Sequence, residues 1–344
     1  KIWSTSTLSN CGPMHLQLES EMAGHLGVPF ISLFNNGTTA LLVGLQVLDV
    51  SGEVITTPYS FVATAHSILW NGLTPVFADI GDKSLNLAPE AIEAAITPRS
   101  VAIMPVHCYG NPCNVQRIEA IAKRHGLKVI YDAAHAFGVQ YRGQSVLRHG
   151  DVSVLSFHAT KVFSTIEGGA IVSRDAASKA RIDRLRNFGI AGDELVSEVG
   201  LNGKMNEVQA AFGLLQLRRI GEALRRRQEI DAIYRYHLSD VDGITCLPPA
   251  ADTVSNFAYF PVFVGPKAAV DRDQIYTRMR ERGIFARKYF YPLLSSFPMY
   301  RDLPSSAPDN LPNATRVARE VLCLPMHQNL SAADITAVVD AVRG

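Results

Sequence analysis

Several features that would assign a protein to a broad class are missing from this sequence. Its 344 residues carry 33 lysines and arginines against 32 aspartates and glutamates, so the basic excess typical of nucleic-acid binding is absent. No apolar run reaches membrane-spanning length, and the first residues lack the apolar core of a signal peptide. We therefore expect a cytoplasmic protein that binds neither nucleic acid nor a membrane. Because the sequence begins with Lys1, we also expect it to be trimmed at this end.

Cysteine is scarce as well, and its spacing argues against a metal centre. The cysteines are odd in number and form no pair with convincing metal spacing: Cys11, Cys108, Cys113, Cys246 and Cys323. We interpret them as reduced thiols of a cytosolic protein and expect no metal site. Internal repeats and low-complexity tracts are also absent.

The glycine fingerprint of a dinucleotide site is the last notable absence. A nicotinamide-dependent dehydrogenase carries GxGxxG after its first strand, whereas the first predicted strand here is followed by NNGTTA. This class of oxidoreductase is therefore excluded.

Strand-like and helix-like segments alternate along the first half of the chain. The strand candidates are continuous apolar runs, as expected for strands covered on both faces: 30–34, 53–57, 75–80, 101–107, 128–134, 152–157 and 168–173. Helical segments precede and separate them: 13–26, 40–48, 60–70, the stretch after Pro89, 115–125 and 176–188. This alternation predicts an α/β fold with a mainly parallel sheet and helices on both faces.

The pattern changes in the second half. We expect an irregular loop at 189–204 and one long helix at 206–240, of the kind that bridges two domains. Shorter strands and helices follow, with an aromatic segment at 287–292, and predict a smaller α+β domain. The chain is therefore divided into a large α/β domain, 1–220, and a small C-terminal domain, 221–344.

One lysine lies in a short polar turn between two apolar strands, within SFHATKVFSTIEGGA. Lys161 follows Ser156 by five residues and has no basic neighbour. An amine held by buried strands on both sides can lose its proton through desolvation and attack a carbonyl group. When Lys161 is considered alone, the more common interpretation is an ordinary lysine on a surface loop.

Other polar or aromatic residues follow predicted strands. Thr38 and Thr39 begin a helix whose free amides can bind an anion, or they cap that helix. Asp132 can hold a proton on a ring nitrogen or cap a helix. Phe61 can stack on an aromatic ring or fill the core, and Ser156 can hold a phosphate oxygen. A phosphate cradle, a ring stacker, a carboxylate for a ring nitrogen and a Schiff-base lysine together indicate pyridoxal phosphate.

With these motifs, the sequence resembles the pyridoxal-phosphate-dependent sugar aminotransferases of the DegT/StrS group, which belong to the fold type I aminotransferase superfamily. The resemblance covers nearly the whole chain, through NGTTAL, PYSFVATA, DAAHAFG, SFHATKVFSTIEGGAIV, LNGKMNEVQAA and LPMHQNLS. The DAAHAFG and SFHATK…EGGA blocks are its specific parts. The fold implied is a large cofactor-binding α/β domain with a smaller C-terminal domain.

The resemblance also implies roles for individual residues. Lys161 would bind the cofactor covalently and move protons, Asp132 would pair with the pyridine nitrogen, and His135 would lie near the ring 3-hydroxyl. Members of the family are homodimers with shared sites, so Asn202 or Lys204 would contact the partner's cofactor phosphate. Family members often carry arginine where Lys204 stands. The other implied cofactor contacts are Thr38, Thr39, Ser156 and Phe61.

The activity implied is transfer of an amino group from glutamate to a nucleotide-linked ketosugar in deoxyaminosugar, O-antigen or polysaccharide biosynthesis. SFHATK followed by EGGA is similar to enzymes that aminate C4 of a 4-keto-6-deoxy sugar, such as dTDP-4-keto-6-deoxyglucose. One alternative is another fold type I enzyme: a C3 sugar aminotransferase, a lyase, or an amino-acid aminotransferase with Arg287 as its candidate carboxylate-binding residue. The other is a non-catalytic cofactor-binding regulator, which would have lost Lys161 or Asp132.

Overall fold

The computed structural model describes residues 2–344 and joins the apolar strands of the first half in one seven-stranded sheet. The strand order is β1–β9–β8–β5–β4–β2–β3, and only β9 runs antiparallel to its neighbours. The prediction of a mainly parallel sheet is thus confirmed. The strands are β1 (Phe30–Phe34), β2 (Glu53–Thr56), β3 (Thr74–Phe77), β4 (Ser100–Met104), β5 (Lys128–Asp132), β8 (Val152–Ser156) and β9 (Gly169–Ser173).

Alternating side chains place an apolar core on each face of this sheet. On β5, Val129 and Tyr131 belong to one core and Ile130 to the other, as the two-residue period of a strand requires. The first core is covered by α2 (Pro13–Leu26), α5 (Pro89–Ala95), α6 (Val115–His125) and the start of α8. The second is covered by α3 (Gly37–Gln46), α4 (Val62–Trp70) and α7 (Ala176–Leu185).

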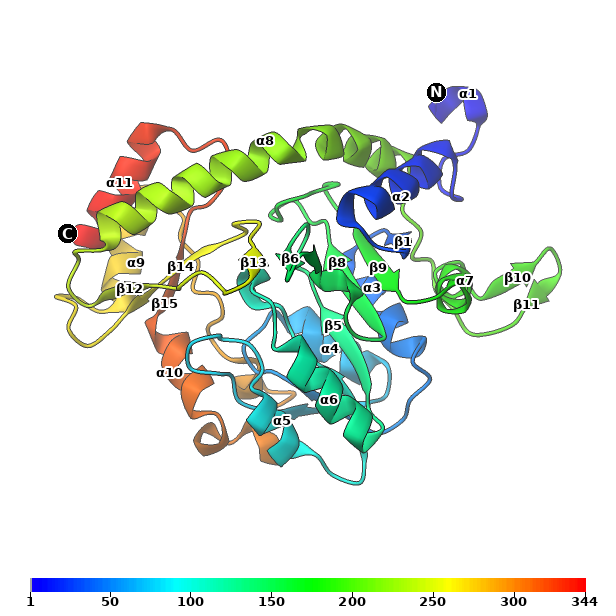
Figure 1. The fold of residues 1–344 in the computed structure, drawn as a ribbon, viewed down its shortest axis with the longest axis horizontal. Coiled ribbons are helices and arrows are strands. Elements are labelled where there is room, and N and C mark those ends of the chain that lie inside the picture. The colour runs from blue at the N-terminus through cyan, green and yellow to red at the C-terminus, as the bar shows by residue number, and fades with distance from the viewer. Residues whose placement is uncertain (1) are drawn as a thin grey trace.

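A single helix, α8 (Glu207–Leu238), runs along the top of the molecule in Figure 1. Its 32 residues span about 48 Å, and a capping box between Asn206 and Gln209 fixes its start. The predicted domain boundary at 220/221 falls inside this helix and stays a prediction.

The C-terminal half of α8 packs on a second apolar core, built on a three-stranded antiparallel sheet. This sheet consists of β12 (Ile244–Cys246), β14 (Phe260–Val264) and β15 (Val321–Leu324). The neighbouring helices are α9 (Arg272–Glu281), α10 (Pro312–Glu320) and α11 (Ala332–Arg343). Shorter elements include α1 (Ile2–Thr5), β6 (Gln140–Tyr141), β7 (Gln144–Ser145) and β13 (Thr253–Val254).

The loop predicted as irregular at 189–204 contains a β-hairpin, so that prediction was wrong. β10 (Ile190–Gly192) pairs with β11 (Leu195–Val196), and the hairpin projects from the body of the molecule (Figure 1). Strands of two or three residues are too short to produce a periodic apolar pattern, which explains the error. Apolar side chains in and beside the hairpin are exposed, with Val199 at 85%.

Several elements end earlier than their apolar runs predict. β4 ends at Met104 rather than at residue 107, because Pro105 follows and has no N–H to donate to a neighbouring strand. β5 ends at Asp132 rather than at residue 134, and α7 ends at Leu185 rather than at 188.

Within residues 2–344, no helix combines the length and apolar character needed to cross a bilayer. The same part of the chain holds no group of three or more His, Cys, Asp or Glu side chains placed to bind a metal ion. All five cysteines are free thiols.

Asp79 connects the end of β3 to a distant helix. Its side chain is buried, with 8% exposed, and its two oxygens accept hydrogen bonds from the Asn313 and Ala314 amides at 2.9 Å each. These amides lie in the first turn of α10, where backbone N–H groups have no partner within the helix. A residue beside the large sheet therefore caps a helix 234 residues further along the chain.

We expect Asp79→Ala to lower the free energy of unfolding by about 2 kcal/mol, because two buried amides lose their acceptor. A matched control is Asp82→Ala, which removes an exposed ion pair with Arg316 on the same helix and should cost less than about 1 kcal/mol. Urea denaturation followed by circular dichroism measures both. Equal losses in the two variants would contradict the capping role of Asp79.

Candidate active site

A cavity of about 540 Å³ lies beyond the carboxyl ends of the large sheet's strands, where open α/β sheets bind their ligands. It brings together residues that are far apart in the sequence. Those predicted from the sequence are Thr38, Thr39, Phe61, Asp132, His135, Ser156 and Lys161. The predicted residues Asn202 and Lys204 are not part of its lining.

The start of α3 forms one wall of this cavity. Asn36 caps the helix by accepting a hydrogen bond from the Thr39 amide at 2.8 Å, so the alternative in which Thr38 or Thr39 is the cap is wrong. Gly37 approaches the end of β8 so closely that an added Cβ would lie 2.9 Å from the Ser156 Cβ. The exposed Thr38, the Ser156 hydroxyl and the free amides of a helix start therefore face one space, which suits an anion.

Asp132 is a buried carboxylate fixed by two donors. The Thr64 hydroxyl donates to Oδ2 at 2.7 Å, and the Ala134 amide donates to Oδ1 at 3.1 Å. Turns rather than a helix follow β5, so the alternative reading of Asp132 as a helix cap is wrong. Burial raises the pKa of Asp132, while the hydrogen bonds from Thr64 and Ala134 and the charge of Lys161 oppose the rise.

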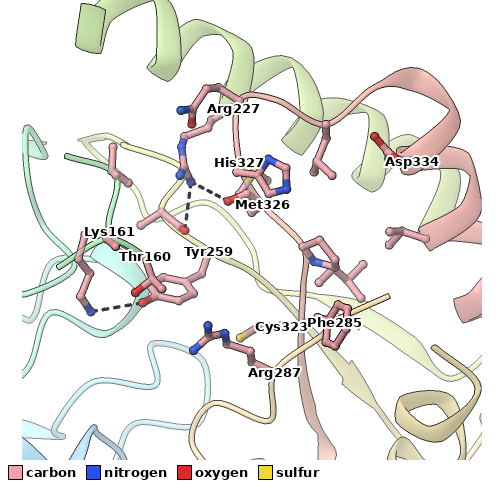
Figure 2. A pocket seen from close by; sticks show the side chains of 18 of the residues that line it. Thr160, Lys161, Arg227, Tyr259, Phe285, Arg287, Cys323, Met326, His327 and Asp334 are labelled. Atoms are coloured by element: carbon pink, nitrogen blue, oxygen red, sulfur yellow. Dashed lines mark hydrogen bonds between the residues drawn. The ribbon is translucent and has the colours of Figure 1, made fainter. Parts of the chain in front are cut away.

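Lys161 lies between this cavity and a second one. Its Nζ donates to the Tyr259 hydroxyl at 3.4 Å, the contact drawn as a dashed line in Figure 2. Burial lowers the pKa of Lys161 to about 8; the carboxylate of Asp132 opposes this effect and the charge of Arg287 adds to it. A substantial fraction of the amine is therefore neutral near physiological pH, as a nucleophile requires.

His135 is buried as a neutral imidazole. The Tyr109 amide donates to its Nδ1 at 3.1 Å, so Nδ1 is an acceptor and the ring proton must lie on Nε2. Burial lowers the pKa of His135 well below its usual range, and the charge of Lys161 lowers it further. The ring stacks on Phe290, with centroids 5.9 Å apart, and thus offers one fixed donor to the cavity.

Phe61 lies at the edge of the cavity and directly precedes α4. Its side chain is 55% exposed, so the alternative reading of Phe61 as a core residue is wrong. An exposed phenyl ring beside a polar cavity is free to stack on a flat ligand.

The loop that carries Asn202 and Lys204 lies beside β1, next to the cavity wall that the start of α3 forms. Lys204 pairs with Phe34, and the buried Lys204 amine donates to Asn187 Oδ1 at 2.7 Å and Asn202 Oδ1 at 3.1 Å. Asn202 is exposed. Within one chain the structure thus keeps these two side chains apart from the other predicted cofactor residues.

A second and larger cavity, of about 990 Å³, adjoins the first, and Figure 2 shows side chains that line it. Both are lined by Thr160, Lys161, Arg287 and Tyr289, so the amine is accessible from either side. The rest of the larger lining comes mainly from the C-terminal part of the chain, including Arg227, Phe285, Met326 and His327.

Three residues of the site were not foreseen from the sequence. Thr64 fixes Asp132, Tyr109 fixes the His135 tautomer, and Tyr259 contacts Lys161. Thr64 lies within the PYSFVATA motif, so its polar position in an apolar helix was a usable signal. Tyr259 is 98 residues from Lys161, and nothing in the local pattern connects the two.

Comparison of the whole chain with known families decides its relationship. The model described as the DegT/DnrJ/EryC1/StrS aminotransferase family matches residues 1–343. The chain belongs to this family. The family predicted from the motifs is thereby confirmed, and the protein is an aminotransferase.

Individual relatives agree with this assignment. A protein of Shigella dysenteriae named dTDP-4-amino-4,6-dideoxy-D-glucose transaminase is 53% identical, over 99% of this chain and 93% of its own length. An Escherichia coli protein of the same name is 50% identical, over 100% and 93%. The solved structure of DesI in the presence of its TDP-sugar product superposes with a TM-score of 0.94 at 37% identity, covering 99% of this chain and 87% of that one. The predicted fold type I architecture of this aminotransferase is confirmed.

We expect acetic anhydride to modify Lys161 of the cofactor-free aminotransferase with a midpoint near pH 8. Only the neutral amine reacts, so labelling rises with pH and levels off above the pKa; mass spectrometry of the Lys161 peptide measures it. Asp132→Asn should move the midpoint to lower pH, because the carboxylate of Asp132 raises the pKa of Lys161.

Glu167→Gln is the matched control, since Glu167 lines the same cavity but is exposed to solvent. It should leave the midpoint unchanged. A wild-type midpoint near 10.4, the value of an ordinary lysine, would show that Lys161 is fully solvated.

Proposed function

We propose that this aminotransferase uses pyridoxal 5′-phosphate to move an amino group from glutamate to C4 of dTDP-4-keto-6-deoxyglucose. The observation that carries the proposal is the position of Lys161. This amine, with its lowered pKa, lies between a cavity suited to a phosphate and a flat ring and a larger cavity suited to a second substrate. The names of the relatives at 53% and 50% identity support dTDP as the nucleotide and C4 as the position.

The residues of the smaller cavity fit pyridoxal phosphate. The amides at the start of α3, the Thr38 hydroxyl and Ser156 would bind the phosphate. Thr39 would contribute less than Thr38, because its amide donates to Asn36 Oδ1 at 2.8 Å and its hydroxyl to Asn35 Oδ1 at 2.6 Å. Phe61 would lie against the ring.

Asp132 and His135 would act at two different polar positions of the ring, its nitrogen and its 3-hydroxyl oxygen. Asp132 keeps acceptor capacity beyond its bonds from Thr64 and Ala134, and would hold a proton on the ring nitrogen. The fixed Nε2–H of His135 would donate to the ring oxygen. When bound, the cofactor supplies an electron sink for negative charge on the substrate carbon.

Lys161 would perform the proton transfers. With a pKa of about 8, its amine can both accept and return a proton near neutral pH, as a general acid–base requires. Tyr259 holds the amine by accepting its hydrogen bond, and so limits where the proton is delivered.

Arg287 supports glutamate as the amino donor. It lines both cavities and is close enough to Lys161 to influence the pKa of the amine. A guanidinium group in this position can pair with a substrate carboxylate. The same observation would favour an amino-acid aminotransferase, which is the second candidate function.

The deciding assay offers the purified protein L-glutamate and a panel of acceptors, and measures 2-oxoglutarate. We expect product with dTDP-4-keto-6-deoxyglucose and little with nucleotide-linked 3-keto sugars or 2-oxo acids. Lys161→Ala should retain the cofactor non-covalently and Asp132→Ala should retain it on Lys161, and each variant should lose at least about 100-fold in turnover. Equal turnover with a 3-keto sugar or a 2-oxo acid would refute the proposed specificity.

We place the active enzyme in the cytoplasm as a homodimer whose sites are shared between chains, with Asn202 and Lys204 reaching the partner's phosphate. The exposed apolar side chains of the β10–β11 hairpin support a protein surface that covers them. The exposure of Asn202 supports its availability to a partner.

Two inactive variants test the shared site. Asn202→Asp would repel the phosphate while a carboxylate oxygen still accepts from Lys204, and Lys161→Ala removes the amine. In a mixed dimer one site combines the native Lys161 of the first variant with the native loop of the second. After complete exchange roughly a quarter of all sites would be native, so that share of activity should return. If verified subunit exchange restores nothing, the loop does not serve the partner's site.

A further inference from the structure

Arg227 is a buried cation without a buried anion. It lies on α8, is 4% exposed, and forms no ion pair within the described part of the chain. Its Nη1 donates to the carbonyl oxygens of Met326, Phe257 and Ala258 at 3.0, 3.2 and 3.4 Å. Its Nε is buried and has no hydrogen-bond partner. One edge of the guanidinium group is therefore satisfied by the protein, and the other is not.

Such an arrangement is costly unless something compensates for it. A buried charge needs hydrogen bonds and a counter-charge, and carbonyl dipoles supply only part of this. Burial lowers the pKa of Arg227 to about 10, which still leaves it charged at neutral pH. A purely structural role, linking α8 to the two strands below it, explains the bonds of Nη1 but not the unpartnered Nε.

The missing counter-charge is expected in the larger cavity. Arg227 is part of its wall, and Figure 2 shows the guanidinium group hydrogen-bonded to Met326. Arg282, Arg287 and Lys161 also line this cavity. Among its described lining residues the single carboxylate is Asp334, which is engaged as an acceptor by the amide and hydroxyl of Ser331 at 2.9 and 2.7 Å. The cavity therefore favours an anionic ligand.

The position of Arg227 relative to Lys161 restricts the shape of that ligand. Tyr259 lies between them: its hydroxyl meets the Lys161 amine, and the carbonyl preceding it, on Ala258, accepts from Arg227. A ligand whose carbonyl carbon lies at Lys161 would thus have its negative charge at Arg227. About the length of the Tyr259 residue would separate the two ends of the ligand. A sugar with a diphosphate on the far side of its ring has this layout.

On the basis of the function proposed above, we propose that Arg227 binds the diphosphate of the nucleotide-linked sugar through the unpartnered edge of its guanidinium group. An arginine fork suits this ligand because it can give two parallel hydrogen bonds to phosphate oxygens. Arg227 would thereby distinguish nucleotide-linked sugars from free sugars.

Calorimetric titration of the cofactor-loaded protein tests the role of Arg227. Arg227→Met should weaken the binding of thymidine diphosphate by roughly 30-fold or more, because it removes charge-assisted hydrogen bonds to phosphate. The binding of thymidine, which lacks phosphate, should not change. Arg227→Lys keeps the charge without the fork and should give an intermediate loss. Arg282→Met removes an exposed arginine from the same cavity and should weaken binding less than about threefold.

A second measurement avoids any effect of the substitutions on folding. In the wild-type protein, the Nε–H resonance of Arg227, identified by its loss in Arg227→Lys, should shift on addition of thymidine diphosphate but not of thymidine. Unchanged affinity in a folded Arg227→Met, or an unmoved resonance, would overturn the assignment of Arg227 alone. A wild-type protein that does not bind thymidine diphosphate would instead overturn the proposed nucleotide substrate.

Discussion

The site depends on keeping an amine and a carboxylate buried in one cavity without neutralising each other. Asp132 ends β5, and Lys161 follows β8, which is the neighbouring strand in the sheet. Adjacent strands lie about 4.8 Å apart, so the sheet itself brings the two segments close. Each group then has its own hydrogen-bond partner: the hydroxyl of Thr64 for the carboxylate and that of Tyr259 for the amine. Burial lowers the pKa of Lys161, and the nearby carboxylate of Asp132 offsets only part of that effect.

Much of the surrounding structure serves the same constraint. Gly37 and Gly169 let the start of α3 approach the strand ends more closely than any side chain would allow, since a Cβ on Gly169 would lie 2.7 Å from the Asn36 carbonyl oxygen. Burial and the charge of Lys161 lower the pKa of His135 and keep it neutral, and the Tyr109 amide fixes its tautomer. A positive charge on His135 would weaken the interaction by which Asp132 would keep a proton on the nitrogen of the cofactor ring.

The order of strands and helices, and the residues at the strand ends, could be read from the sequence because each depends on local pattern. Asp132, Ser156 and Lys161 belong to short motifs, and the cavity brings them together. Tyr259 and Arg227 could not be foreseen in this way, since α8 and the chain beyond it contribute to the site and local periodicity says nothing about this contribution. The hairpin at Ile190–Val196 was missed because its strands are very short. Asn202 and Lys204 came only from resemblance to the family, and one chain alone gives them no place in the cavity.

The hydrogen bonds between Asp79 and α10 bear on how this sequence can be recombined with its relatives. A chimera joined at residue 220 would take Asp79 from one parent and the capped amides of Asn313 and Ala314 from the other. The stability of the chimera would depend on whether the two parents have the same distance between the Asp79 carboxylate and the start of α10. An exchange that transfers the end of β3 together with α10 takes both sides of this contact from the same parent. The segments that must be exchanged together are therefore not contiguous in the gene.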